Sequence, residues 1–212
     1  MKDSNNKLES LKNNLKKLDS VAIAYSGGQD SSFLLKIAKD VLKNKVMAIT
    51  ITSVAQPKSE LKDAKSFTKK IGVKHIVQSV DILAVKNFSD NTSKRCYYCK
   101  KQIFKKIKDI AKQDGFPHVL DASTMDDMKD YRLGMKASKE LGIRSPLIET
   151  GFSKKEIKKL LQEMRLPQLD KPSSPCLASR IPYGTKITKS RLKTIDNAEE
   201  IIKKGVPAWN AW

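Results

Sequence analysis

The sequence predicts an α/β protein with a doubly wound parallel β-sheet and helices on both faces of that sheet. Segments with strand character alternate with segments of helical periodicity along the chain. The strand segments are short and mostly apolar, as expected for strands that are covered on both faces. No internal repeat or low-complexity linker interrupts the alternation. This pattern is typical of a parallel sheet whose crossover connections are helices.

The order of the elements follows from where each pattern begins and ends. Strands are predicted at residues 21–24, 45–52, 74–78 and 118–121, and helices at residues 8–18, 30–42, 59–71, 100–112, 127–141, 154–163 and 190–204. Ligands bind at the carboxyl ends of the strands in such sheets. We therefore expect one site to be faced by the loops that follow Ala24, Thr52, Gln78 and Asp121.

The turn between the first predicted strand and its helix has the sequence Ser-Gly-Gly-Gln-Asp-Ser, residues 26–31. Glycine lets a backbone approach a ligand closely, and a helix N-terminus supplies unpaired N–H groups and partial positive charge. These features predict a phosphate-binding loop, which is not of the Walker A type because no Gly-Lys-Ser/Thr follows. The alternative is a turn in which Asp30 or Ser31 only caps the helix. The residues assigned to phosphate are Ser26, Gly27, Gly28, Asp30 and Ser31; Asp30 also suits Mg²⁺.

Three cysteines form the second candidate group. Cys96 and Cys99 are spaced as Cys-x-x-Cys, and Cys176 lies in a proline-rich passage. A four-cysteine zinc site needs a second pair, whereas three thiolates suit an iron–sulfur cluster with one iron left open. The alternative is three thiols that share no site. The odd number argues against a disulfide framework.

Two further polar segments supply candidate residues. An acidic stretch after the strand at 118–121 contains Asp126 and Arg132, which we assign to contact with metal–phosphate and with a substrate acid. Part of this stretch has a structural explanation, since acidic residues favour a first helical turn. In the proline-rich passage, Lys171 and Arg180 flank Cys176, and nearby cations lower a thiol pKa. Arg180 suits bidentate binding of a carboxylate or phosphate, although a purely structural turn is the alternative.

Composition limits the class of protein. The chain has 212 residues and a net charge of +19, but the basic residues are mostly lysines spread along the predicted helices. This distribution is typical of solvated helix faces, so a nucleic-acid partner is not expected, and aromatic residues for base stacking are few. No apolar run approaches the roughly 20 residues that span a bilayer. The start of the chain lacks a signal-peptide pattern, so we expect a cytoplasmic protein without a membrane partner.

The phosphate loop resembles the PP-loop signature of the ATP pyrophosphatases, enzymes of the adenine nucleotide alpha hydrolase-like fold. That resemblance implies cleavage of ATP to AMP and pyrophosphate. Residues 1–166 are accordingly expected to form a PP-loop ATP pyrophosphatase domain. Residues 167–212 are expected to form an active-site loop and the start of a truncated C-terminal segment.

Five motifs in order resemble the LarE-type ATP-dependent sacrificial sulfur transferases: SGGQDSS, RCYYCKKQIF, DDMKDYRLG, GIRSP and KPSSPCLASRIPYGTKIT. The resemblance implies a role in making the nickel-pincer nucleotide cofactor of lactate racemase. ATP would adenylate a carboxylate of pyridinium-3,5-biscarboxylic acid mononucleotide, and sulfur would replace the activated oxygen to give a thiocarboxylate. It also implies a homo-oligomer and a further β-containing segment that this chain lacks.

The resemblance assigns roles to individual residues. The loop residues given above match those that hold the ATP phosphates, and Cys176 matches the cysteine that attacks the acyl-adenylate. Some family members give up the sulfur of that cysteine. Others use three cysteines to hold a [4Fe-4S] cluster that carries an extra sulfide. Cys96, Cys99 and Cys176 fit the second kind, so ATP, Mg²⁺ and a [4Fe-4S] cluster are the expected cofactors.

Three other functions remain open at the level of sequence. A PP-loop tRNA-thiolating enzyme shares the three-cysteine chemistry, but no zinc-ribbon cysteine pairs flank the core. An amidating ligase of the NAD-synthase or GMP-synthase kind would use ammonia and would need neither the cysteine pair nor Cys176. A nucleotide-binding or RNA-binding module without catalytic activity is the third alternative.

Overall fold

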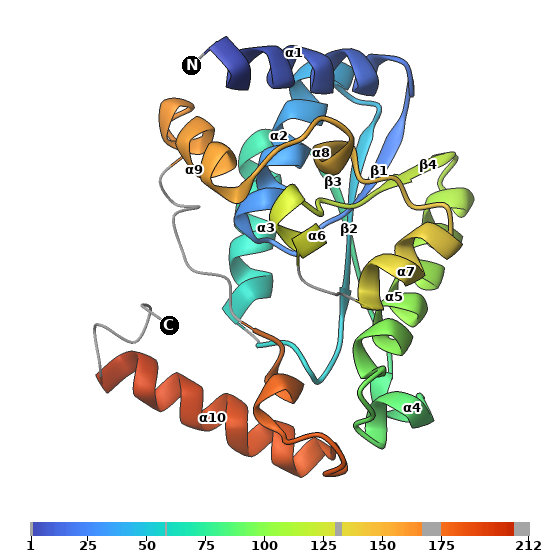
Figure 1. Cartoon of the computed structure of the whole chain (residues 1–212), viewed down its shortest axis with the longest axis vertical. Helices are drawn as coiled ribbons and strands as arrows, with labels where there is room; N and C mark the ends of the chain where they lie inside the picture. The colour runs from blue at the N-terminus through green and yellow to red at the C-terminus, as the bar shows by residue number, and fades with distance from the viewer. Residues whose placement is uncertain (1, 58, 130–132, 167–174, 206–212) are drawn as a thin grey trace.

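Four parallel strands form the centre of the molecule. The structure is a computed structural model that describes residues 2–57, 59–129, 133–166 and 175–205. In the order of the sheet, the strands are β3 (Lys74–Ser79), β2 (Val46–Thr52), β1 (Val21–Ala24) and β4 (His118–Leu120), all parallel. Ile23 of β1 is in register with Ala48 of β2 and Leu120 of β4. The arrows of these strands run through the middle of the molecule in Figure 1.

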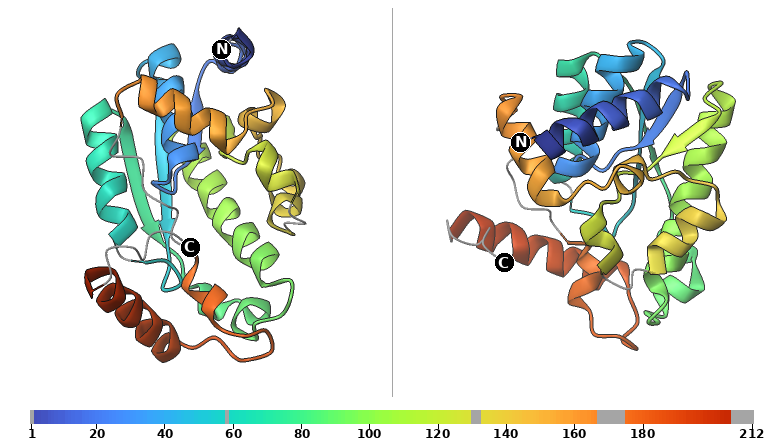
Figure 2. Two further views of the ribbon diagram at one scale, coloured as in Figure 1. Left: turned by 60° about the vertical axis from the view of Figure 1, so that its left-hand side comes forward. Right: turned by 45° about the horizontal axis from the view of Figure 1, so that its top comes forward.

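Helices surround the sheet and carry most of its connections (Figures 1 and 2). Their bounds are α1 (Lys2–Lys16), α2 (Gln29–Leu42), α3 (Ser59–Ile71), α4 (Lys86–Ser89), α5 (Arg95–Gln113), α6 (Met125–Lys129), α7 (Leu133–Glu140), α8 (Pro146–Glu149), α9 (Lys154–Glu163) and α10 (Lys189–Gly205). Two 3₁₀ turns, η1 (Ile82–Ala84) and η3 (Leu177–Arg180), complete the described elements. None of the helices in the described ranges is long and apolar enough to cross a membrane.

Two hydrophobic clusters, one on each face, explain why the strands read as continuous apolar runs. Val21 and Ile23 of β1 face a cluster that includes Leu34 of α2. Ala22 of the same strand faces a second cluster that includes Phe104 of α5. Successive side chains of a strand point to opposite faces, so both sets must be apolar when helices cover both faces. The predicted fold class is confirmed.

A third cluster attaches the C-terminal part of the described chain to the body. Leu177, Ile181 and Leu192 pack with Ile82 and Phe88, which belong to the connection between β3 and α5. The backbone N–H of Leu177 also donates to the carbonyl of Ala55 at 2.9 Å. Helix α10 therefore lies at the end of the molecule opposite α1, as Figure 1 shows.

The element boundaries agree closely with the sequence patterns at β1, α3 and α9, where the bounds coincide. Helix α5 begins at Arg95 and not at residue 100, which places the Cys-x-x-Cys pair inside its first turns. Of the helix expected over residues 127–141, the structure describes α6 as far as Lys129 and α7 from Leu133 to Glu140, and residues 130–132 lie outside the described residues. The buried side chain of Arg95 donates to the carbonyl of Ile181, and tertiary contacts of this kind supply most helix stability in proteins.

Candidate nucleotide and thiol site

The phosphate loop joins β1 to α2 and is organised by its own hydroxyl groups. The Oγ atoms of Ser26 and Ser31 lie 3.0 Å apart. Ser31 Oγ also donates to the carbonyl of Gly28 at 3.1 Å, and the Gly28 N–H donates to Ser26 Oγ at 3.3 Å. The loop is therefore closed into a compact turn at the N-terminus of α2, where backbone N–H groups attract anions.

The two glycines of the loop have different reasons to be glycine. Gly27 has a φ of +85°, and a Cβ at this position would lie 3.0 Å from the Cβ of Ala64. Gly28 is the N-cap of α2 with φ −76° and ψ 170°, a conformation that any residue adopts. Gly27 is thus required by the backbone and by packing against α3, whereas Gly28 leaves an open approach to the loop.

A cavity of about 730 Å³ adjoins the loop at the carboxyl ends of the strands. Its walls come from β1 and the phosphate loop, from α5, from the segment after β4 and from α9. Three of the four loops expected to face one site contribute lining residues: Ser26 after β1, Gln56 after β2 and Ser123 after β4. The loop after β3 contributes none of the lining residues, because it packs instead under the C-terminal segment through Ile82. A cavity is thus present at the strand ends, and its use as the expected site stays a prediction.

The carboxylates beside the loop occupy different surroundings. Burial raises the pKa of Asp30 to about 6; Lys154 acts against this shift, and Asp127 and Asp126 reinforce it. Asp127 lines the cavity, is 7% exposed and lies 3.1 Å from the Nζ of Lys154. Its other carboxylate oxygen accepts from the N–H and hydroxyl of Thr124. Asp30, Asp127 and Lys154 thus form a charged group in contact with the cavity.

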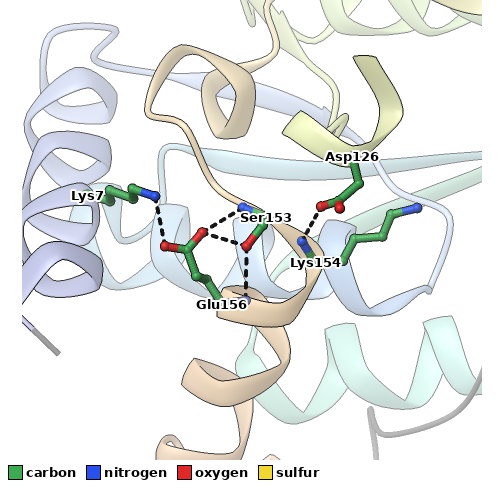
Figure 3. Close-up of polar contacts among 5 residues, drawn as sticks. All are labelled: Lys7, Asp126, Ser153, Lys154 and Glu156. Carbon is green, nitrogen blue, oxygen red and sulfur yellow. Dashed lines mark hydrogen bonds and ion pairs between the residues drawn. The ribbon is translucent and has the colours of Figure 1, made fainter. Parts of the chain in front are cut away.

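Asp126 has a partner at the start of α9, as Figure 3 shows. Its carboxylate accepts from the backbone N–H of Lys154 at 2.7 Å, and Asp126 is not among the residues that line the cavity. Beside it, Ser153 and Glu156 form a capping box at the N-terminus of α9. Lys7 of α1 donates to Glu156 at 2.8 Å in the same view (Figure 3). These contacts fix the end of α9 that presents Lys154 to the cavity.

The three cysteines come from separate parts of the chain but influence one another electrostatically. Cys96 is exposed and Cys99 half-buried on α5, and Cys176 is exposed just before η3. Burial raises the pKa of Cys99 to about 12, and Cys176 and Cys96 both reinforce the shift. The three thiols therefore lie within electrostatic range of one another. The shared site for Cys96, Cys99 and Cys176 stays a prediction.

The thiol of Cys176 differs from expectation in its protonation. Although Cys176 as a residue is exposed, neighbouring protein atoms desolvate its thiol and raise its pKa, and Cys96 acts in the same direction, while the backbone N–H groups of Ala178 and Ser179 and the charge of Arg95 lower it. The net shift of the pKa is upward, so the expected lowering by flanking cations is wrong, because desolvation outweighs the cations. Lys171 lies outside the described residues.

The two arginines assigned to substrate acid groups stand differently in the structure. Arg180 contacts Glu199 of α10 at 2.8 Å. Arg132 also lies outside the described residues.

The thiols supply donor chemistry that suits an iron–sulfur cluster, but their arrangement is not that of a formed metal centre. Within the part of the chain that the structure describes, no three His, Cys, Asp or Glu side chains gather closely enough to hold a metal ion. The same holds for the carboxylates around Asp30.

Several cavity residues were not singled out from the sequence. Lys100 and Phe104 of α5 and Lys158 of α9 line the cavity. Phe104 also belongs to the second core cluster. Lysines are numerous along every helix, so neither Lys100 nor Lys158 carried a distinguishing signal.

Known proteins resemble this chain in sequence and in fold. A family model described as NAD synthase matches residues 4–112. An uncharacterized protein of Synechocystis, slr1717, is 40% identical over 198 residues, covering 93% of this chain and 74% of the relative. The pyridinium-3,5-bisthiocarboxylic acid mononucleotide synthase of Lactiplantibacillus plantarum is 36% identical over 190 residues, 89% of this chain and 69% of the relative.

Solved structures support the fold. The NMN synthetase of Francisella tularensis superposes with a TM-score of 0.65 at 16% identity, covering 93% of this chain and 86% of that chain. An NH₃-dependent NAD synthetase from Campylobacter jejuni gives a TM-score of 0.60 at 17% identity, covering 97% and 86%. The fold and the loop together define the class, a PP-loop enzyme of the NAD synthase family that uses ATP. Within this class, the chain belongs to the LarE family, that of the pyridinium-3,5-bisthiocarboxylic acid mononucleotide synthase.

Proposed function

We propose that this protein is an ATP-dependent sulfur transferase that converts a carboxylate of pyridinium-3,5-biscarboxylic acid mononucleotide to a thiocarboxylate, in the biosynthesis of the nickel-pincer nucleotide. The observation that carries the proposal is a phosphate loop with an adjoining cavity, in a chain whose Cys96, Cys99 and Cys176 lie within electrostatic range of one another. The relative from Lactiplantibacillus plantarum supports the identity of the substrate.

The first step activates the carboxylate. A substrate carboxylate oxygen attacks the α-phosphorus of ATP, the bond to the bridging oxygen breaks, and pyrophosphate leaves. We assign Ser26, Gly27, Gly28 and Ser31 to the ATP phosphates, because they form a helix N-terminus beside the cavity. Asp30 and its neighbour Asp127 supply carboxylate oxygens that Mg²⁺ prefers in company with phosphate. The loop N–H groups and Mg²⁺ would accelerate this step by stabilising the negative charge of the departing pyrophosphate.

The second step transfers sulfur. The thiol of Cys176 gives up its proton to solvent as its sulfur attacks the acyl carbon, the bond to the phosphate oxygen breaks, and AMP leaves. When Cys176 is the donor, its α-proton is removed and its Cβ–Sγ bond breaks, which releases the thiocarboxylate and leaves dehydroalanine. We assign Arg132 and Arg180 to the substrate acid groups, and Asp126 to metal–phosphate contact, as further parts of the same proposal.

A [4Fe-4S] cluster held by Cys96, Cys99 and Cys176 is the alternative sulfur source within this proposal. Such a cluster would supply a sulfide bound at an open iron and spare the thiol of Cys176. Anaerobic purification with iron and sulfide quantification tests it. About four irons per chain, lost in Cys96→Ser and Cys99→Ser, support the cluster. Absence of iron after reconstitution assigns sulfur donation to Cys176 alone.

One experiment tests the transfer itself. The purified chain is incubated with Mg-ATP and the dicarboxylate mononucleotide, and the small molecules and the intact protein are measured by mass spectrometry. AMP together with a thiocarboxylate product is the expected result, and Cys176→Ser should abolish the product while ATP binding persists. Donation by Cys176 would lower the protein mass by about 34 Da, one H₂S. AMP without any sulfur-containing product would overturn the proposal.

Amidation is the second candidate, because the matching family model is that of NAD synthase. The same reaction mixture supplied with ammonium distinguishes the two activities. An amide product that survives Cys176→Ser would establish a ligase. A thiocarboxylate product that depends on Cys176, with no amide formed, would exclude the ligase activity. Static light scattering on the same preparation measures whether the chain forms the expected homo-oligomer.

A further inference from the structure

Asn91 occupies an unusual position just before α5. It is fully buried, and its backbone φ of 55° lies in the left-handed region, which asparagine tolerates better than most residues. The Nδ2 of its side chain lies 2.7 Å from the carbonyl of Pro182 and 2.8 Å from that of Thr185. A longer contact of 3.3 Å reaches the carbonyl of Ile181. One buried side chain thus contacts three backbone carbonyls of a segment about 90 residues further along the chain.

Backbone hydrogen bonds join the same two segments. The N–H of Gly184 donates to the carbonyl of Asn91 at 3.1 Å. The N–H of Ile187 donates to the carbonyl of Ser89 at 2.8 Å. We call residues 181–187 the clasped segment, because both its backbone N–H groups and its backbone carbonyls are hydrogen-bonded to residues 89–95. The attachment is polar and specific as well as hydrophobic, so it fixes the position of the segment and not only its burial.

Arg95 completes this attachment from the first turn of α5. It is only 7% exposed, and its NH1 donates to Asn91 Oδ1 and to the carbonyl of Ile181. Its guanidinium lies 4.3 Å from the ring centroid of Tyr183, a cation–π arrangement. Among the ion pairs of the described residues, none includes Arg95. Its charged group is therefore oriented by carbonyl and aromatic partners that all belong to the attachment.

The clasped segment is continuous with the thiol site. Cys176 precedes η3, and η3 ends at Arg180, directly before Ile181. On the other side of the attachment, Arg95 is the immediate neighbour of Cys96 and lies one turn from Cys99. The contacts of Asn91 and Arg95 therefore join the helix that carries two thiols to the segment that carries the third.

We propose that Asn91 and Arg95 are positioning residues for sulfur transfer: they hold the clasped segment against α5 and thereby keep the Cys176 thiol beside those of Cys96 and Cys99. The inference rests on the proposed function only in that sulfur transfer is the reason why the thiols must lie together. The placement of the thiols is a property of the chain that can be measured without ATP or substrate.

The test measures how readily thiols are bridged by dibromobimane, a short reagent that links two cysteines. A Cys99→Ser protein retains Cys96 and Cys176, so bridging reports the contact between α5 and the clasped segment. A Cys176→Ser protein retains Cys96 and Cys99 on one helix, so bridging there reports α5 alone. Peptide mapping by mass spectrometry identifies the linked pair. The rate of bridging follows the effective concentration of one thiol near the other.

Three substitutions are compared in each background. Asn91→Asp keeps the shape of the side chain but replaces the donor group that faces the carbonyls. Asn91→Gly keeps the left-handed backbone and removes the side chain. Asn87→Asp makes the same chemical change at an exposed position four residues earlier and serves as the matched control. Arg95→Met is the additional variant if either Asn91 variant unfolds, because it removes the charged anchor and keeps an apolar side chain.

The expected result is a loss of Cys96–Cys176 bridging of about tenfold in the Asn91 and Arg95 variants. Cys96–Cys99 bridging and ATP binding should stay at the level of Asn87→Asp. With all cysteines present, the same variants should lower the rate of thiocarboxylate formation and leave KM for ATP unchanged. Unchanged Cys96–Cys176 bridging in folded variants would overturn the proposal, whatever the activity. An absence of sulfur transfer in the unsubstituted chain would contradict the proposed function and leave the bridging result valid.

Discussion

The hydroxyl oxygens of Ser26 and Ser31 lie 3.0 Å apart. This contact joins the start of the phosphate loop to the first turn of α2. Each hydroxyl has one hydrogen and two lone pairs. The Ser31 hydroxyl also approaches the carbonyl of Gly28, so the loop is held in shape by groups that are themselves suited to phosphate. The loop geometry is thus set before nucleotide binds, which lowers the entropic cost of binding.

Substitution of the two glycines should separate binding from folding. Gly28→Val places a side chain where phosphate approaches, on a backbone that accepts it; we expect ATP binding to be lost with little change in Tm. Gly27→Val forces a β-branched residue to a φ of +85° and against Ala64. The left-handed conformation alone costs about 1–2 kcal/mol, so this variant should be markedly destabilised.

Isothermal titration calorimetry with ATP and a thermal melt of each variant provide the comparison. Two outcomes contradict the assignment of the loop. One is unchanged ATP affinity in Gly28→Val, and the other is a Gly27→Val protein as stable as the unsubstituted chain.

Asp30 should limit stability at neutral pH. Its pKa in the folded chain is about 6, above the ordinary value of 3.8, chiefly because of burial. Between these values the folded state binds more protons than the unfolded state, so stability falls as pH rises through this range and stays lower above it. Asp30→Asn should therefore stabilise the chain by about 1 to 2 kcal/mol near pH 8 and have little effect near pH 4.

Urea denaturation of both proteins at the two pH values measures this difference. The same variant should lose the Mg²⁺ dependence of ATP binding, since an amide is a poorer ligand than a carboxylate. Equal stabilisation at both pH values would show that burial of the Asp30 charge is not the cause.

The contact between Lys7 and Glu156 should make part of the stability sensitive to acid. Although burial opposes it, the hydrogen bonds from Lys7 and Ser153 lower the pKa of Glu156 to about 2. A lowered carboxylate pKa contributes stability above its ordinary value of 4.5, and that contribution is lost as pH falls towards about 2. We expect Lys7→Met to cost about 1 kcal/mol at neutral pH.

The loss caused by Lys7→Met should shrink as Glu156 becomes protonated in acid. Chemical denaturation at a series of acidic pH values follows it. Lys12→Met is the control, because Lys12 pairs with the exposed Glu9 on the same helix. A constant difference between Lys7→Met and the unsubstituted chain across the series would contradict the linkage.

Arg180 is expected to bind a substrate acid group, and the structure gives it a second partner in Glu199. Arg180→Ala should weaken binding of the dicarboxylate nucleotide far more than binding of ATP. It also deprives the buried carboxylate of Glu199 of one partner, which destabilises the chain. The double variant Arg180→Ala with Glu199→Gln should recover stability without recovering substrate binding.

Calorimetric titration of both ligands against both variants makes this distinction. Recovery of substrate affinity in the double variant would show that Arg180 acts only through its contact with α10.

The sequence predicted those features that depend on local pattern. Val21 to Ala24 read as a buried strand because every residue is apolar, and both faces of β1 are indeed covered. The phosphate loop was recognised because its glycines and hydroxyls are contiguous. The two-glycine turn alone did not show that Gly27, and not Gly28, takes the positive φ.

Features that depend on distant contacts were not predicted. Helix α5 begins at Arg95 because that side chain is held by the clasped segment, and nothing near Arg95 in the sequence signals those partners. The cavity lysines Lys100 and Lys158 are indistinguishable in sequence from solvated lysines. Desolvation of the Cys176 thiol likewise depends on the packing of surrounding segments, so the sequence indicated cations near Cys176 but not the balance between charge and burial.

The order of the strands has a consequence for how the chain folds. The central strand β1 is completed by residue 24, but its two neighbours are β2 and β4, and β4 begins only at His118. Synthesis runs from the N-terminus. The partner of one edge of β1, strand β2, is therefore made early, whereas β4, the partner of the other edge, is made only after about half of the chain. Pairings between such distant segments form slowly. Substitutions in β4, a strand of three residues, should therefore slow refolding out of proportion to the length of that strand.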